Sequence, residues 1–282
     1  MNPAYALAAV TSGVFGTADF LGGFASRRAS ALTVTFVSGL AGLVSLCVAQ
    51  VWIHGAPAPA DFGWGLAAGL CGGTGVALLF RAYAIGPVSI AAPVISLVSL
   101  AVPVIAGIAL GERPSSLAIG GIVLAAGAFP LLASTGERFD PRGVHAVARV
   151  VGIASASGVL VGGFLVFMSR VSLSAGLIPL FASRLVTVAL FGTILGVRRA
   201  PFWPAASARR PTILSGLLDS FANVGYFIAV HHGALALVGT IISLSPVSTV
   251  LLARLVLRER WSVPQRWGLA LATTAIVCVS LG

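Results

Sequence analysis

Three ionisable residues lie inside long apolar stretches of the sequence: Asp19, Arg184 and Asp219. A carboxylate can bind a cation or a proton, and a guanidinium can bind an anion or pair with a carboxylate. Placing such a charge among apolar groups is costly unless it has a partner or faces water. These residues therefore indicate a polar pathway in an otherwise apolar protein.

Helical spacing adds further polar and aromatic side chains to this set. Asn223 and Tyr226 follow Asp219 by four and seven residues, so the three would share one face of a helix. Phe15 precedes Asp19 by four residues and would share its face. A stripe of Asp, Asn and Tyr makes poor contact with lipid, and we interpret it as the lining of a polar cavity.

Arg184 is the natural counter-charge for either acid, and Arg81 and Tyr83 are expected to line the same cavity from a third helix. The sequence also allows arrangements without a shared cavity. Asp19 could pair with the arginines at positions 27 and 28, and Arg184 and Arg81 could extend toward the membrane surface with their charges in water.

The composition indicates a membrane protein. Of 282 residues, 58% are hydrophobic and 9% are charged, and the mean hydropathy is +1.04. A soluble globular chain carries roughly 25% charged residues, so this chain is neither soluble nor disordered. The net charge of +10 comes from seventeen arginines placed between apolar runs. We read them as orienting the chain in a bilayer and predict no nucleic-acid partner.

The apolar runs predict an all-α membrane protein with ten transmembrane helices. About 20 residues are needed to cross a bilayer, and continuous apolar runs exclude a β-barrel. The predicted spans are 4–25, 31–52, 63–84, 88–110, 116–134, 146–169, 175–196, 212–230, 234–257 and 264–281.

The two halves of the sequence resemble each other. An offset of 147 residues superposes Gly86 on Gly233 and Glu112 on Glu259. Because each half holds an odd number of spans, the second half enters the membrane from the opposite side, as in many secondary transporters. The sequence therefore predicts an inverted repeat made of a first five-helix unit over 1–134, a linker over 135–145 and a second unit over 146–282.

The fourth and ninth spans carry two further features. Pro93 and Pro246 are expected to interrupt them, because proline removes a backbone hydrogen bond. Glu112 beside Arg113, and the equivalent pair at 259–260, are expected to be ion pairs at the ends of these spans.

The repeated ends of these spans, Leu-Gly-Glu-Arg at 110–113 and Leu-Arg-Glu-Arg at 257–260, resemble the EamA branch of the drug/metabolite transporter superfamily. The segment 16–28 also resembles the first-span signature of some bacterial members. The resemblance implies a ten-helix permease that moves small metabolites or drugs, often outward. One departure is Thr274, which stands where the first copy has Gly127.

The motifs of other function classes are missing from the sequence. It contains no HExxH, GxSxG or nucleotide-binding loop, so we expect no catalytic residue, no cofactor and no metal site. The expected partners are a small-molecule substrate and the bilayer, with the protein a monomer or homodimer. The driving force is a solute gradient, an exchange of solutes or protons as coupling ion, and the sequence leaves these three open. An intramembrane enzyme and a channel-like facilitator are the alternatives.

The arginines predict the orientation. Thirteen of the seventeen fall in or next to connections on one side, which the positive-inside rule makes cytoplasmic. The composition, rich in Arg, Ala and Gly and without Lys, is typical of a GC-rich bacterial gene, and we expect the protein in the bacterial plasma membrane. Tags at the two termini should therefore react with membrane-impermeant reagents from outside intact cells. Tags that react only after the cells are opened would contradict this orientation.

Overall fold

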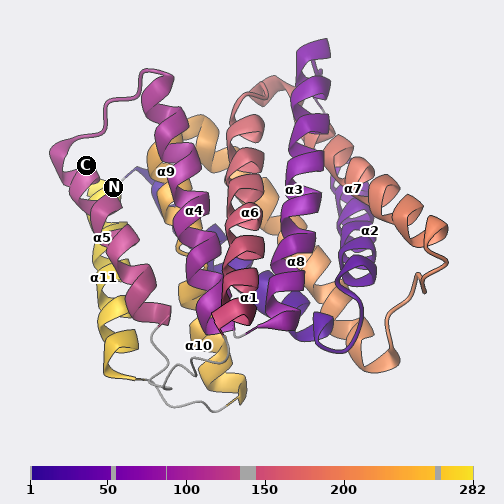
Figure 1. Ribbon diagram of the computed structural model, residues 1–282. Helices are drawn as coiled ribbons and strands as arrows, with labels where there is room; N and C mark the ends of the chain where they lie inside the picture. Colours follow the sequence, from indigo (N-terminus) through magenta and orange to yellow (C-terminus); the bar gives the residue numbers. More distant parts are fainter. Residues whose placement is uncertain (1, 52–54, 87, 134–143, 258–261, 282) are drawn as a thin grey trace.

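The protein is a bundle of helices in a computed structural model that describes residues 2–51, 55–86, 88–133, 144–257 and 262–281 (Figure 1). The helices in these residues are α1 Pro3–Ser26, α2 Ala31–Ala49, α3 Pro59–Ile85, α4 Val88–Ala109, α5 Ser116–Ala133, α6 Val144–Ser169, the 3₁₀-helix η2 Leu173–Ala175, α7 Ile178–Val197, α8 Ala206–His232, α9 Leu235–Ser243, α10 Pro246–Leu257 and α11 Val263–Leu281.

Seven of these helices are long and apolar enough to cross a membrane, namely α1 to α4 and α6 to α8. Shorter apolar helices occur in α5 and in the region of α9 and α10. Helices satisfy their own backbone hydrogen bonds, which lipid cannot do, so an apolar chain of this kind crosses the bilayer as a helical bundle. The all-α membrane fold is confirmed, and most of the predicted linker at 135–145 lies outside the described residues.

The helix boundaries reproduce the internal repeat. α3 and α8 are both 27 residues long, and both their first and their last residues are 147 positions apart. α2 and α7 begin 147 positions apart, as do α5 and α11. Corresponding helices run in opposite directions across the bundle because five spans separate them. The molecule is thus two five-span units of inverted topology.

The ninth span, predicted over 234–257, is two helices and not one. α9 ends at Ser243 and α10 begins at Pro246, so the predicted interruption of this span is confirmed. Proline lacks the N–H that would continue the first helix but fits the first turn of a new one. The corresponding α4 runs unbroken through Pro93 and Pro103, so the predicted interruption at Pro93 was wrong.

Helix α1 packs directly on the break between α9 and α10. A side chain at Gly16 would collide with the carbonyl oxygen of Ser245, so only glycine allows this approach. The hydroxyl of Thr249 donates to the Gly16 carbonyl at 3.0 Å, and the hydroxyl of Ser12 donates to the Ile242 carbonyl at 3.3 Å. α1 therefore satisfies one of the carbonyls near the end of α9 and binds the start of α10.

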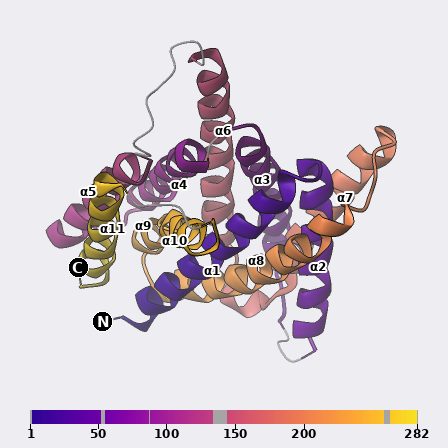
Figure 2. The same ribbon diagram turned by 90° about the horizontal axis from the view of Figure 1, so that it is seen from below.

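The arrangement of the bundle sets α5 and α11 side by side at one edge, with α2 and α7 at the other (Figures 1 and 2). α1 packs along α8 between these edges. The two ends of the chain lie close together (Figures 1 and 2). We call the side of the bundle where α1 begins and α8 ends the terminal face, and the other side the arginine-rich face.

Glu112, in the loop after α4, holds the start of α9 on the terminal face. Its carboxylate accepts hydrogen bonds from the backbone N–H groups of Leu235 at 2.6 Å and Ala236 at 2.9 Å. A helix start has unpaired N–H groups and a partial positive charge, so a carboxylate is favourable there. The expected ion pair of Glu112 with Arg113 is not formed, and the equivalent pair at 259–260 lies outside the described residues.

Replacing Glu112 by glutamine should destabilise the protein by about 1 kcal/mol, because a neutral amide offers one oxygen in place of the charged carboxylate. The measurement is the free energy of unfolding in detergent. Arg113→Gln, a change at the exposed neighbouring residue, is the control and should leave that free energy unaltered. Equal stability of Glu112→Gln and the control would contradict the capping role.

Candidate functional site

A central cavity lies between the two repeats. Its walls come from α1, α3 and α4 of the first repeat and from α6 to α10 of the second. It has a volume of about 830 Å³, including space open to the outside. Its wall is mostly apolar with a few polar and charged side chains, which is the composition of a site for a small organic molecule.

Arg184 and Asp219 form an ion pair in the wall of this cavity. α7 supplies the guanidinium and α8 supplies the carboxylate, and their side chains are 15% and 16% exposed. Asn223, one turn further along α8, donates from Nδ2 to the Asp219 carbonyl at 2.6 Å and to its carboxylate oxygen Oδ2 at 3.2 Å. The guanidinium and the amide thus fix the Asp219 carboxylate from two sides.

Asp19 lines the same cavity from α1 and has no ion pair or hydrogen-bond partner among the side chains that the structure describes. It does not pair with the arginines that follow α1, which was the alternative that the sequence allowed. Arg28 instead lies over the Phe24 ring, with its guanidinium carbon 4.2 Å from the ring centroid. Asp19 is therefore a carboxylate that the cavity leaves available.

The other predicted site residues divide into two groups. Phe15, Tyr83 and Asn223 line the cavity together with the three charged residues. Tyr226 does not, because it is fully buried and its hydroxyl donates to the Leu165 carbonyl at 2.6 Å. Arg81 is exposed and also lies outside the cavity wall. The helical spacing placed Tyr226 on the correct helix, but the side chain packs against α6.

Sequence reasoning missed the serines and threonine of the wall. Ser96 and Ser243 occupy equivalent positions of the two repeats, within the matching Ile-Ser-Leu segments of α4 and α9, and both line the cavity. Ser99 on α4 donates to the Ser243 hydroxyl at 3.3 Å and joins the two spans. Ser96 and Ser243 could have been predicted from the sequence, because the repeat alignment places a polar residue at the same position of both apolar halves.

A smaller chamber of about 320 Å³ shares the three charged residues with the cavity. Hydroxyl groups of Thr35, Ser38 and Ser215 line it. Thr35 lies one turn into α2, which begins on the arginine-rich face. Asp19, Arg184 and Asp219 therefore border both spaces.

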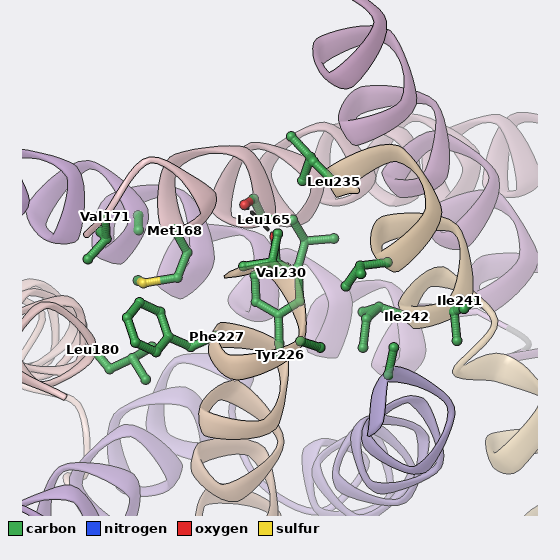
Figure 3. Packing of buried hydrophobic residues seen from close by; sticks show 14 of the residues in the cluster. Leu165, Met168, Val171, Leu180, Tyr226, Phe227, Val230, Leu235, Ile241 and Ile242 are labelled. Carbon is green, nitrogen blue, oxygen red and sulfur yellow. Dashed lines mark hydrogen bonds between the residues drawn. The ribbon is translucent and has the colours of Figure 1, made fainter. Parts of the chain in front are cut away.

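Buried apolar side chains pack between the cavity and the terminal face. Along α8, Asn223 in the cavity wall is followed by Tyr226, Phe227 and Val230, which pack in this cluster. Figure 3 shows them together with Leu165 of α6 and with Ile241 and Ile242 of α9. We call this set, which comprises Leu165, Tyr226, Phe227, Val230, Leu235, Ile241 and Ile242, the terminal seal.

The side chains of the cavity wall can bind a polar or charged solute. In the part of the chain that the structure describes, no group of three or more His, Cys, Asp or Glu side chains is placed to hold a metal ion. The cavity offers one free carboxylate, one fixed ion pair, an amide, several hydroxyl groups and the aromatic rings of Phe15, Tyr83 and Phe164.

Comparisons with known proteins give a family and a fold. The family model of the EamA-like transporter family matches residues 2–133 and 149–281. Among 25 matching chains of solved structures, one described only as "Crystal structure of protein" superposes with a TM-score of 0.77 at 19% sequence identity. The match covers 100% of this chain and 98% of that one, and at this identity it shows the fold alone. No curated protein matches the chain.

Removing either partner of the Arg184–Asp219 pair should destabilise the protein, because the other charge is then left unpaired in the membrane core. Arg184→Gln and Asp219→Asn should each lower the free energy of unfolding in detergent by about 3 kcal/mol. The double variant should recover most of that loss, because no unpaired charge remains there. Losses that simply add in the double variant would show that the two side chains are not coupled.

Proposed function

Because this chain belongs to the EamA-like transporter family, we propose that it is a secondary transporter of small organic solutes that works by alternating access between its two repeats. The chain is a multi-pass integral membrane protein, and the family is one of transporters. We propose the plasma membrane as its location and no catalytic activity of its own.

The observation that carries the proposal is the central cavity, which both repeats build and in which three ionisable side chains meet. Charged residues within membrane spans are rare and mark solute or ion pathways when they face a cavity. Two inverted repeats that enclose a binding site near mid-membrane are the arrangement used by secondary transporters. The cavity is therefore where we place the transported solute.

Alternating access requires that the closure of the cavity toward each membrane face can open and form again. The terminal seal closes the cavity toward one face by apolar packing, with the Tyr226–Leu165 hydrogen bond as its polar contact. The break between Ser243 and Pro246 gives one wall a point where two short helices can change their relative angle. We propose that opening this seal exposes the cavity to the terminal face.

Asp19 is the group that we propose to carry a coupling proton. It faces Arg184 and Asp219, which are paired with each other, so Asp19 is free to exchange a proton. The small chamber adds the hydroxyl groups of Thr35, Ser38 and Ser215 beside it. With that face in the cytoplasm, the sealed terminal face corresponds to a state that loads solute from inside, which suits the export that the family resemblance implies.

The test is the reactivity of a cysteine in the cavity from each side of the membrane. The three natural cysteines, Cys47, Cys71 and Cys278, are first replaced, and Ser243→Cys then supplies one thiol in the wall. In right-side-out and in inside-out vesicles, a membrane-impermeant thiol reagent should label it from both sides, because the cavity opens to each in turn.

Val197→Cys is the matched control, since this residue is 80% exposed at the end of α7 and should react from one side only. Labelling of Ser243→Cys from a single side, under conditions where the control reacts as expected, would contradict alternating access.

A further inference from the structure

We propose that the cargo of the central cavity is a small organic cation with N–H donors, a protonated amine attached to an apolar or aromatic body. This inference rests on the proposed transport function, because it assigns a substrate class to the same cavity. Three independent properties of the wall support it, namely its net charge, its hydrogen-bonding groups and its aromatic rings.

When Asp19 is ionised, the described side chains of the wall carry one net negative charge. Asp19 and Asp219 contribute two negative charges and Arg184 one positive charge. Arg184 is already paired with Asp219, so the uncompensated charge is that of Asp19. Holding an unpaired charge away from bulk water is unfavourable, and a monocation in the cavity would neutralise it. A proton can also neutralise Asp19, so a cationic cargo would displace that proton, whereas a neutral cargo offers no compensating charge and an anion would add repulsion.

The hydroxyl groups of the wall present acceptors to the cavity. Ser183 donates its hydrogen to the Leu180 carbonyl at 2.8 Å, and Thr187 donates to the Ser183 carbonyl at 3.0 Å. Ser99 can donate to the Ser96 carbonyl at 3.1 Å. Each hydroxyl has a single hydrogen, which these bonds use, so the oxygen lone pairs remain for a donor.

Asn223 supplies the clearest unmet acceptor. Its Nδ2 group donates to two oxygens of Asp219, which fixes the orientation of the amide and turns Oδ1 away from them. This residue is 4% exposed, and its Oδ1 has no hydrogen-bond partner among the described residues. A buried acceptor without a donor costs about 1–3 kcal/mol, which an N–H group of the cargo would offset.

Aromatic rings complete the wall around these acceptors. Phe15 on α1, Tyr83 on α3 and Phe164 on α6 all line the cavity. A cation over an aromatic face is attracted to it, and the apolar part of an amine is favoured against the same rings. The Arg184 N–H groups that do not contact Asp219 can donate, as can the hydroxyls of Tyr83, Ser96, Ser243 and Ser245. A zwitterion is therefore the competing cargo that a test must include.

Binding of matched probes to the purified full-length protein in lipid nanodiscs tests the inference, with calorimetry at a pH where the amine is protonated. The probes are 2-phenylethylamine, its N,N,N-trimethyl analogue, 2-phenylethanol, 3-phenylpropionate and phenylalanine. The amine should bind most tightly. The trimethyl analogue keeps the charge but cannot donate, so it should bind about tenfold more weakly, and the alcohol and the carboxylate should not bind measurably.

Asp19→Asn should weaken amine binding by at least about tenfold, because the cavity then has no uncompensated negative charge. Asp61→Asn is the matched control. Asp61 begins α3 on the terminal face, outside the cavity wall, and accepts hydrogen bonds from the Ser172 N–H and hydroxyl at 2.8 and 2.7 Å. That variant should bind the amine as the wild type does.

Several results would overturn the assignment. One is tighter binding of the trimethyl analogue, of phenylalanine or of 3-phenylpropionate than of the amine. Another is that Asp19→Asn binds the amine as tightly as the wild type does. The third is that no probe binds. The labelling of Ser243→Cys separates the two proposals. If Ser243→Cys is labelled from both sides but the amine does not bind, the cargo class is wrong and alternating access stands. If the amine binds but labelling occurs from one side only, the cation site stands and alternating access is wrong.

Discussion

The structure depends on the need to compensate charge inside an apolar bundle. Arg184 and Asp219 meet this need by pairing across α7 and α8, and Asn223 supports the pair by hydrogen bonds to Asp219. Asp19 on α1 has no such partner among the side chains that the structure describes. One compensated pair and one uncompensated carboxylate in a shared cavity can tell cations from anions, and the cavity exists only because helices of both repeats leave space around these groups.

The two repeats contribute a symmetric frame and an asymmetric site. Helix lengths and starting points repeat at an offset of 147 residues, most closely in α3 and α8. The charges do not repeat, since Asp219 corresponds to Gly72 at this offset and both residues line the cavity. A symmetric frame allows two mirror-related openings of similar energy, while an asymmetric wall lets the cargo be recognised by one set of groups in both.

Much of the fold could be predicted from the sequence, because the cost of exposing backbone to lipid leaves few choices for a chain this apolar. The spans follow from composition and the repeat from its spacing, whereas the family resemblance rests on the motifs at 110–113, 257–260 and 16–28. Positions within helices were harder to predict. Pro93 and Pro246 looked alike as helix breakers, yet only the helix at Pro246 is broken, where α1 and its Gly16 pack against the exposed backbone. Glu112 looked like the partner of Arg113 but caps α9, which is 123 residues away in sequence from its first N–H contact.

The sequence by itself determined that this protein lies in a membrane as two inverted five-span units, and that Asp19, Arg184 and Asp219 need a polar environment. It determined this because hydropathy and repeat spacing are properties of the chain alone. Only the tertiary structure decided that Arg184 pairs with Asp219 rather than with Asp19, that Tyr226 belongs to the terminal seal and that paired serines of α4 and α9 face the cavity. Those outcomes depend on the rotation of each helix against its neighbours, which packing across the whole bundle sets and no local pattern encodes.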